Sequence, residues 1–146
     1  MIRHILVVCV GNICRSPMAE AVLRDALRGQ EELIVESAGL GALVDEPASE
    51  HSVDLMRERG LDISGHRAQQ LTPELVTKAD LILVMESGHR RVIDANEPTA
   101  RGKVYRLGEW QDLEIPDPYR QPRDAFEAAL EKIDKSIADW VERLKN

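Results

Sequence analysis

A thiol, a guanidinium and a hydroxyl lie close together in the sequence, at Cys9, Arg15 and Ser16. They follow a short apolar run and precede an amphipathic segment, an order that predicts a strand, a tight loop and a helix. The first N–H groups of a helix lack intrahelical partners and stabilise an anion. Arg15 adds a planar guanidinium that can hold two oxyanion oxygens. The same positive field favours a thiolate, so Cys9 is predicted to be a nucleophile facing a bound tetrahedral oxyanion.

The alternative interpretation treats Cys9 as a small buried residue that ends a strand and Arg15 as a surface charge. It does not explain why Gly11 and Pro17 stand in the same loop. Gly11 is expected to adopt the positive φ that turns successive amides inward, and Pro17 suits the first turn of a helix. We therefore favour an anion-binding loop. Its predicted phosphate-binding residues are Val10, Gly11, Asn12, Ile13, Cys14, Arg15 and Ser16.

The composition predicts one soluble domain, residues 1–146, with 43% apolar and 31% charged residues. A net charge of −7 without a basic run disfavours nucleic-acid binding. The longest apolar run, Ile5–Val10, is too short to span a bilayer, and no signal peptide is recognised. Two cysteines in one loop imply no disulfide framework and fit a reducing cytoplasm. They are also too few to predict a metal site. We expect a monomer or weak dimer.

Apolar runs without alternation recur between segments of helical periodicity. This pattern predicts a small, doubly wound α/β domain with a four-stranded parallel sheet and helices on both faces. Ligands in such folds bind at the carboxyl ends of the strands, which is where Cys9 is expected. The predicted strands cover residues 2–8, 33–35 (ending at 36–39), 80–85 and 103–107. The predicted helices cover residues 18–28, 49–59, 72–79, 87–95 and 126–144.

The stretch VCVGNICRSP, Val8–Pro17, resembles the signature of the low-molecular-weight protein tyrosine phosphatases. Asp117-Pro118-Tyr119 resembles that family's acid loop, and Ser37–Gly39 and Gly65-His66 also fall where the family has them. The resemblance covers essentially the whole chain. It is strongest to bacterial members, which act beside exopolysaccharide and capsule export systems. The fold that it implies is a small parallel sheet with helices on both sides.

The resemblance implies a mechanism for hydrolysis of phosphotyrosine proteins. Cys9 would attack phosphorus and form a phosphocysteine, while Arg15 and the loop amides bind the equatorial oxygens. Ser16 would donate a hydrogen bond to the thiolate. Asp117 would protonate the leaving oxygen and then activate water. No cofactor or metal is implied, and the implied partner is a bacterial tyrosine autokinase or a sugar-activating enzyme of the same pathway.

Further residues take supporting roles by the same resemblance. Asn12, Ser37 and His66 would hold the phosphate loop in shape. Cys14 would trap oxidised Cys9 as a reversible disulfide. These roles come from the family pattern, since each residue taken singly also suits a structural role.

A pocket for the substrate ring is expected beside the loop. Ile13 and Leu40 would form its apolar walls, Tyr119 would flank the ring, and Arg120 would meet acidic residues around the phosphotyrosine. One departure from the family concerns Gln69, which stands where relatives often carry a basic residue. This departure affects the charge at the edge of the substrate, not the chemistry.

Three other functions compete with this interpretation. Thioredoxin-coupled arsenate reductases share the loop but need further cysteines, and the chain has none after Cys14. Phosphoarginine phosphatases tend to carry a threonine where Ile13 stands, and isoleucine favours a flat aromatic substrate. A non-catalytic phosphopeptide-binding module would need neither Cys9 nor Asp117. We therefore expect a protein tyrosine phosphatase.

Overall fold

The structure is a computed structural model that describes residues 1–145. It contains a four-stranded parallel sheet in the order β2-β1-β3-β4. The strands are β1 (His4–Cys9), β2 (Ile34–Gly39), β3 (Leu81–Val84) and β4 (Val104–Arg106). The predicted four-stranded parallel sheet is therefore confirmed.

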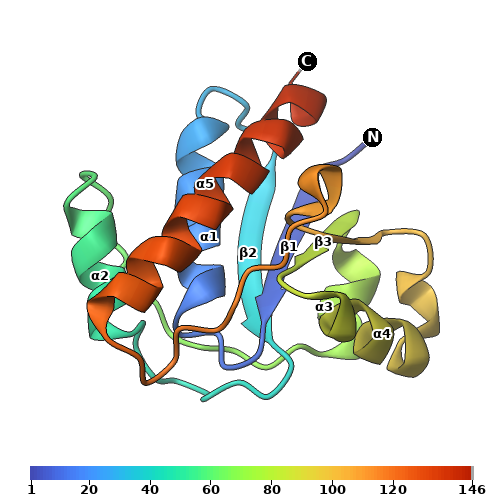
Figure 1. Ribbon diagram of the computed structural model, residues 1–146. Coiled ribbons are helices and arrows are strands. Elements are labelled where there is room, and N and C mark those ends of the chain that lie inside the picture. Colours follow the sequence, from blue (N-terminus) through green and yellow to red (C-terminus); the bar gives the residue numbers. More distant parts are fainter. Residues whose placement is uncertain (146) are drawn as a thin grey trace.

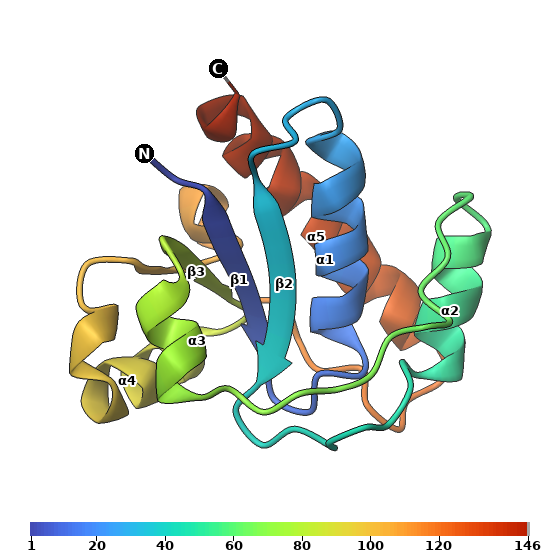
Figure 2. The same ribbon diagram turned by 180° about the vertical axis from the view of Figure 1, so that it is seen from behind.

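Helices cover both faces of this sheet, as predicted (Figures 1 and 2). α1 and α5 lie on one face, α3 and α4 lie on the other, and α2 packs beside α1 and α5. Both termini lie at the end of the sheet opposite to the carboxyl ends of β1 and β2. The helices are α1 (Arg15–Ala26), α2 (Glu50–Arg57), α3 (Pro73–Lys78), α4 (Ser87–Asn96) and α5 (Arg123–Leu144), with short 3-10 turns at η1 (Pro98–Ala100) and η2 (Glu109–Gln111).

β1 is the central strand that carries the predicted nucleophile at its end. Its side chains alternate between two apolar clusters: Ile5 and Val7 face α1 and α5, whereas Leu6 and Val8 face α3 and α4. Both faces are buried, which explains why the sequence of β1 shows no polar alternation. Cys9 ends the strand and pairs in register with Gly39 of β2.

Some boundaries differ from those predicted. α1 begins at Arg15, three residues before the predicted Met18, so the arginine belongs to the first helical turn. α5 begins at Arg123 rather than at Phe126. α3 is capped by Thr72, whose hydroxyl accepts a hydrogen bond from the N–H of Leu75, the third residue of the helix, at 3.2 Å. The sequence pattern located the helices correctly, but apolar periodicity alone does not mark their first turns.

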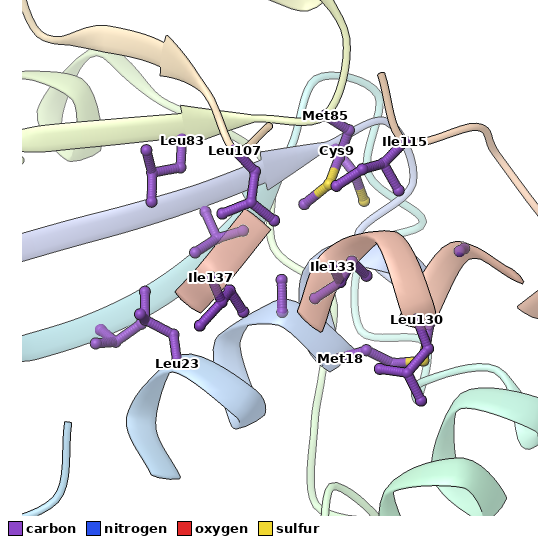
Figure 3. Packing of buried hydrophobic residues seen from close by; sticks show 14 of the residues in the cluster. Cys9, Met18, Leu23, Leu83, Met85, Leu107, Ile115, Leu130, Ile133 and Ile137 are labelled. Atoms are coloured by element: carbon purple, nitrogen blue, oxygen red, sulfur yellow. The ribbon is translucent and has the colours of Figure 1, made fainter. Parts of the chain in front are cut away.

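The segment between β4 and α5 passes over the carboxyl edge of the sheet. Ile115 is fully buried, and its N–H donates to the carbonyl of Met85 at 3.0 Å, just beyond β3. Figure 3 shows Ile115, Met85 and Cys9 grouped at the end of the core. This contact brings residues 116–121, which contain the predicted acid loop Asp117–Tyr119, to the same edge as the nucleophile.

Candidate active site

The phosphate loop, residues 9–16, is held by the scaffold through its backbone carbonyls. Six consecutive carbonyls, from Cys9 to Cys14, each accept a hydrogen bond from outside the loop. The donors are the N–H groups of Leu40, Gly41, Leu43 and Ser49, the ring of His66 and the hydroxyl of Ser52. Across residues 1–145, the N–H groups of residues 11–14 have no protein acceptor. With the carbonyls bonded outward, these N–H groups form a concave set of donors for an anion.

The left-handed residue of the loop is Asn12, with φ 60°, and not Gly11 as predicted. Asparagine tolerates this conformation, and its side chain fixes it. Its Nδ2 donates to the hydroxyls of Ser16 at 2.7 Å and Ser37 at 3.0 Å, and its Oδ1 accepts the N–H of Gln69 at 2.9 Å. Gly11 instead lines the cavity, where the missing side chain leaves room.

The Cys9 thiol lies at the base of the loop and is almost completely buried. Its Sγ is 2.9 Å from the hydroxyl oxygen of Ser16, in the first turn of α1. A hydroxyl at this place can donate to a thiolate and stabilise it. Cys14 is different, because burial, reinforced by the charges of Cys9 and Asp117, raises its pKa to about 12. Cys14 therefore stays a neutral thiol and does not compete as a nucleophile.

Arg15 is only 1% exposed, and a buried guanidinium is costly unless it is paired. Its Nη1 donates to the carboxylate of Glu86 at 2.6 Å and to the carbonyl of Ile115 at 2.7 Å. Its Nε has no hydrogen-bond partner among the described residues, and Nη2 lies 3.7 Å from Asp117 Oδ2. Two anchors thus fix the guanidinium and leave donors for an oxyanion.

A cavity of about 130 Å³ opens above the loop. Cys9, Arg15 and Asp117 line it together, so the three predicted catalytic side chains converge. The cavity also has apolar walls that suit a flat ring. These walls include Ile13, Leu43 and Tyr119.

One predicted pocket residue, Leu40, lies elsewhere than expected, and Arg120 lies beside Tyr119. Leu40 packs against the apolar cluster beneath α3 and α4, and Leu43, three residues later, takes the predicted place as a wall. The guanidinium of Arg120 lies over the Tyr119 ring, 5.2 Å from its centroid. The segment after β2 runs on beside the phosphate loop in the same direction, with the N–H groups of Leu40, Gly41 and Leu43 bonded to its carbonyls, a path that the sequence pattern did not predict.

No described helix is long and apolar enough to cross a membrane. Within residues 1–145, no group of three or more His, Cys, Asp or Glu side chains is arranged to hold a metal ion.

Comparison with known proteins decides the family. The model of the low molecular weight phosphotyrosine protein phosphatases matches residues 4–146. The chain belongs to this family. One relative of the phosphatase, named "Probable low molecular weight protein-tyrosine-phosphatase EpsP", from Ralstonia solanacearum, is 53% identical over 145 residues, which cover 99% of this chain and 98% of the relative.

Two solved structures show how closely the phosphatase follows known members. Vibrio vulnificus Wzb in complex with benzylphosphonate has a TM-score of 0.93 at 42% identity, with 99% of this chain and 100% of that chain covered. The YwlE arginine phosphatase from Geobacillus stearothermophilus has a TM-score of 0.89 at 35% identity, with 97% and 92% covered. The fold and the enzyme class implied by the sequence resemblance are therefore confirmed.

Several residues of the phosphatase site were not identified from the sequence. Glu86 follows β3 at the same sheet edge as Cys9, and this position is the signal that could have found it. Gln69 supports the loop through its N–H, and its side chain donates to the Ser37 carbonyl at 2.8 Å. Ser37 also donates to Glu20 of α1. The predicted supporting residues thus sit in a larger network than the family motifs alone suggested.

Gly39 of the phosphatase leads to a first prediction. A Cβ at this position would lie 2.4 Å from the Val10 carbonyl and 3.1 Å from Asn12 N, so Gly39→Ala should displace the phosphate loop. We expect kcat/KM for an aryl phosphate to fall by about 100-fold, with a clear loss of phosphate affinity. Gly65→Ala is the matched control, because its Cβ meets nothing within 4 Å. Unchanged kinetics in Gly39→Ala would contradict a loop locked by its outward carbonyls.

Proposed function

We propose that this phosphatase hydrolyses protein phosphotyrosine through a phosphocysteine intermediate on Cys9. The observation that carries the proposal is the convergence of Cys9, Arg15 and Asp117 on one cavity. In the first step a bond forms between Cys9 sulfur and phosphorus, and the bond from phosphorus to the phenolic oxygen breaks. Asp117 gives its proton to that oxygen, so tyrosine leaves neutral.

The second step regenerates the enzyme. Asp117, now a carboxylate, takes a proton from water while the water oxygen bonds to phosphorus. The phosphorus–sulfur bond breaks, phosphate leaves, and Cys9 departs as a thiolate that Ser16 can stabilise from 2.9 Å. In both steps the guanidinium of Arg15 and the loop N–H groups bind the equatorial oxygens and balance their charge.

The walls of the cavity favour phosphotyrosine over phosphoarginine. Ile13, Leu43 and Tyr119 offer apolar surface to a flat ring. A branched apolar side chain at position 13 provides no hydrogen-bond partner for the guanidinium of phosphoarginine. The comparisons also support phosphotyrosine, since the sequence of this chain is 53% identical to EpsP, named as a protein-tyrosine-phosphatase, and 35% identical to the arginine phosphatase YwlE. Benzylphosphonate, which carries an aromatic ring, is the ligand of the Wzb structure.

The test is turnover of two matched peptides that differ only in phosphotyrosine or phosphoarginine. We expect kcat/KM at least about tenfold higher for the phosphotyrosine peptide. Ile13→Thr should shift this ratio toward phosphoarginine, because the hydroxyl offers an acceptor and the apolar wall shrinks. A wild-type preference for phosphoarginine would overturn the substrate assignment. Binding of both peptides without turnover would make the chain a phosphopeptide-binding module.

We further propose a physiological substrate and compartment. The tyrosine-rich tail of a membrane-bound tyrosine autokinase linked to exopolysaccharide export would meet this enzyme in the cytoplasm. The support is the resemblance to the bacterial type of the family and the 53% identity to EpsP. A Cys9→Ser protein should capture the phosphorylated kinase, and Cys9→Ser combined with Arg15→Lys should not. Capture of another phosphoprotein in place of the kinase would contradict this assignment.

A further inference from the structure

The acid loop, residues 116–121, has few attachments of its own to the rest of the protein. Its hydrogen bonds stay inside the loop: Tyr119 N–H donates to Asp117 Oδ1 at 3.1 Å, and Gln121 N–H donates to the Pro118 carbonyl at 2.8 Å. Asp117 itself is about 43% exposed at its side chain. Apart from the contact of Asp117 Oδ2 with Arg15 Nη2 at 3.7 Å, the place of the carboxyl group over the cavity is set where the loop begins.

Glu114 anchors that beginning. Its Oε1 accepts hydrogen bonds from the N–H of Ser87 at 3.0 Å and from the Ser87 hydroxyl at 3.1 Å. Its Oε2 accepts from Arg106 Nη1 at 3.0 Å. One side chain thus joins the first residue of α4, the end of β4 and the start of the acid loop.

The same α4 terminus also holds the phosphate-binding arginine. Glu86, directly before Ser87, accepts Arg15 Nη1 at 2.6 Å. Ile115, directly after Glu114, accepts Arg15 Nη1 at 2.7 Å and donates to the Met85 carbonyl at 3.0 Å, next to Cys9 in Figure 3. Hydrogen bonds therefore join residues 85–87 to residues 114–115. Because both segments also bind Arg15, these bonds fix the start of the acid loop relative to the Arg15 guanidinium.

We propose that Glu114 is a positioning residue for Asp117, whose bridge to Ser87 and Arg106 holds the acid loop over the cavity. The inference deepens the proposed function and rests on it. Burial raises the pKa of Glu114, but hydrogen bonds from Ser87 and Arg106 outweigh burial and keep the pKa below its ordinary value. The bridge is therefore charged in neutral and mildly acidic solution, where the carboxylate form dominates.

The experiment measures kcat/KM for phenyl phosphate and for 2,4-dinitrophenyl phosphate in Glu114→Ala and Glu114→Gln. This parameter reports the step in which the leaving group departs. Phenolate needs a proton to leave, whereas dinitrophenolate leaves without one. A displaced Asp117 should therefore cost about tenfold or more on phenyl phosphate and little on the dinitrophenyl ester. Glu114→Gln keeps an acceptor for Ser87, so its loss should be smaller.

Two controls separate positioning from a general loss of structure. Asp112→Asn removes another carboxylate partner of Arg106, 2.8 Å away, without touching Ser87, so it should leave the ratio between the two substrates unchanged. Asn also tolerates the left-handed backbone at this position. Inhibition by inorganic phosphate should be the same in the Glu114 variants as in the wild type, because the phosphate loop is intact.

The double variant with Asp117→Ala gives the decisive comparison. Asp117→Ala alone should lower kcat/KM strongly for phenyl phosphate and little for 2,4-dinitrophenyl phosphate. Adding Glu114→Ala to it should lower kcat/KM for phenyl phosphate by less than about a further twofold. A loss in Glu114→Ala that is equal for both substrates, or that adds to Asp117→Ala, would overturn the inference and leave the proposed function standing. A wild-type chain without turnover would overturn both.

Discussion

The Cys9→Ser variant should lose turnover of aryl phosphates by about 10⁴-fold or more while it still binds phosphate. A serine hydroxyl stays protonated at neutral pH, so the loop would keep its donors and lose its nucleophile. The exchange also preserves a hydrogen-bonding group beside Ser16, whose oxygen lies 2.9 Å from Cys9 Sγ. Steady-state kinetics and calorimetric phosphate binding measure the two effects separately.

The matched control for this prediction is Cys14→Ser. Cys14 is buried in the same loop, but burial and the charges of Cys9 and Asp117 raise its pKa to about 12. Its thiol is therefore not the attacking group, and the variant should keep turnover. If the two variants lost activity equally, the thiol of Cys9 would have no special chemical role.

Arg15→Lys should lower kcat/KM by about 10³-fold or more. The guanidinium meets Glu86 and the Ile115 carbonyl through Nη1, and Nε is left without a protein partner. A lysine ammonium can satisfy the half-buried carboxylate of Glu86, but it cannot also present a planar pair of donors to two phosphate oxygens. Both kcat and phosphate affinity should fall, since the contact exists in the ground state and strengthens in the transition state.

Arg123→Lys tests whether any arginine exchange would have the same effect. Arg123 pairs with Glu58 and Glu127 on the surface of α5, and exposed pairs contribute little to stability. We expect wild-type kinetics for this variant. Near-wild-type kinetics for Arg15→Lys would mean that the loop amides alone carry the phosphate charge.

The sequence contains enough information to predict the sheet and the reacting groups. Buried strands at β1 and β3 lack alternation because helices cover both faces of the sheet, and this pattern, together with the helical segments between the strands, predicts a parallel sheet. The convergence of Cys9 and Asp117 follows from the family resemblance. Neither periodicity nor spacing predicts that a residue 108 positions later meets Cys9, because the sheet-edge contact of Ile115 with Met85 brings them together.

The features that sequence reasoning missed depend on tertiary contacts. The left-handed φ falls on Asn12 and not on Gly11 because Ser16, Ser37 and Gln69 bind the asparagine side chain. Local propensity favours glycine, but the side-chain network selects asparagine. In the same way, Leu43 and not Leu40 forms a pocket wall: the Leu43 N–H is bonded to the Gly11 carbonyl beside the cavity, whereas Leu40 is bonded to the Cys9 carbonyl and packs against the cluster beneath α3 and α4. Such pairings between distant segments leave no periodic signal in the sequence.

In the proposed mechanism the phosphoryl group passes through a covalent bond to Cys9. The most direct test is rapid alkaline quenching of the Asp117→Ala variant during turnover of 2,4-dinitrophenyl phosphate, whose leaving group needs no proton, followed by mass spectrometry of its peptides. This variant should accumulate the intermediate, because it lacks the base that activates water. We expect one phosphoryl group on the peptide that contains Cys9, and none after the additional exchange Cys9→Ser. A phosphoryl group on another residue such as His66, or phosphate release without any labelled enzyme, would contradict the account.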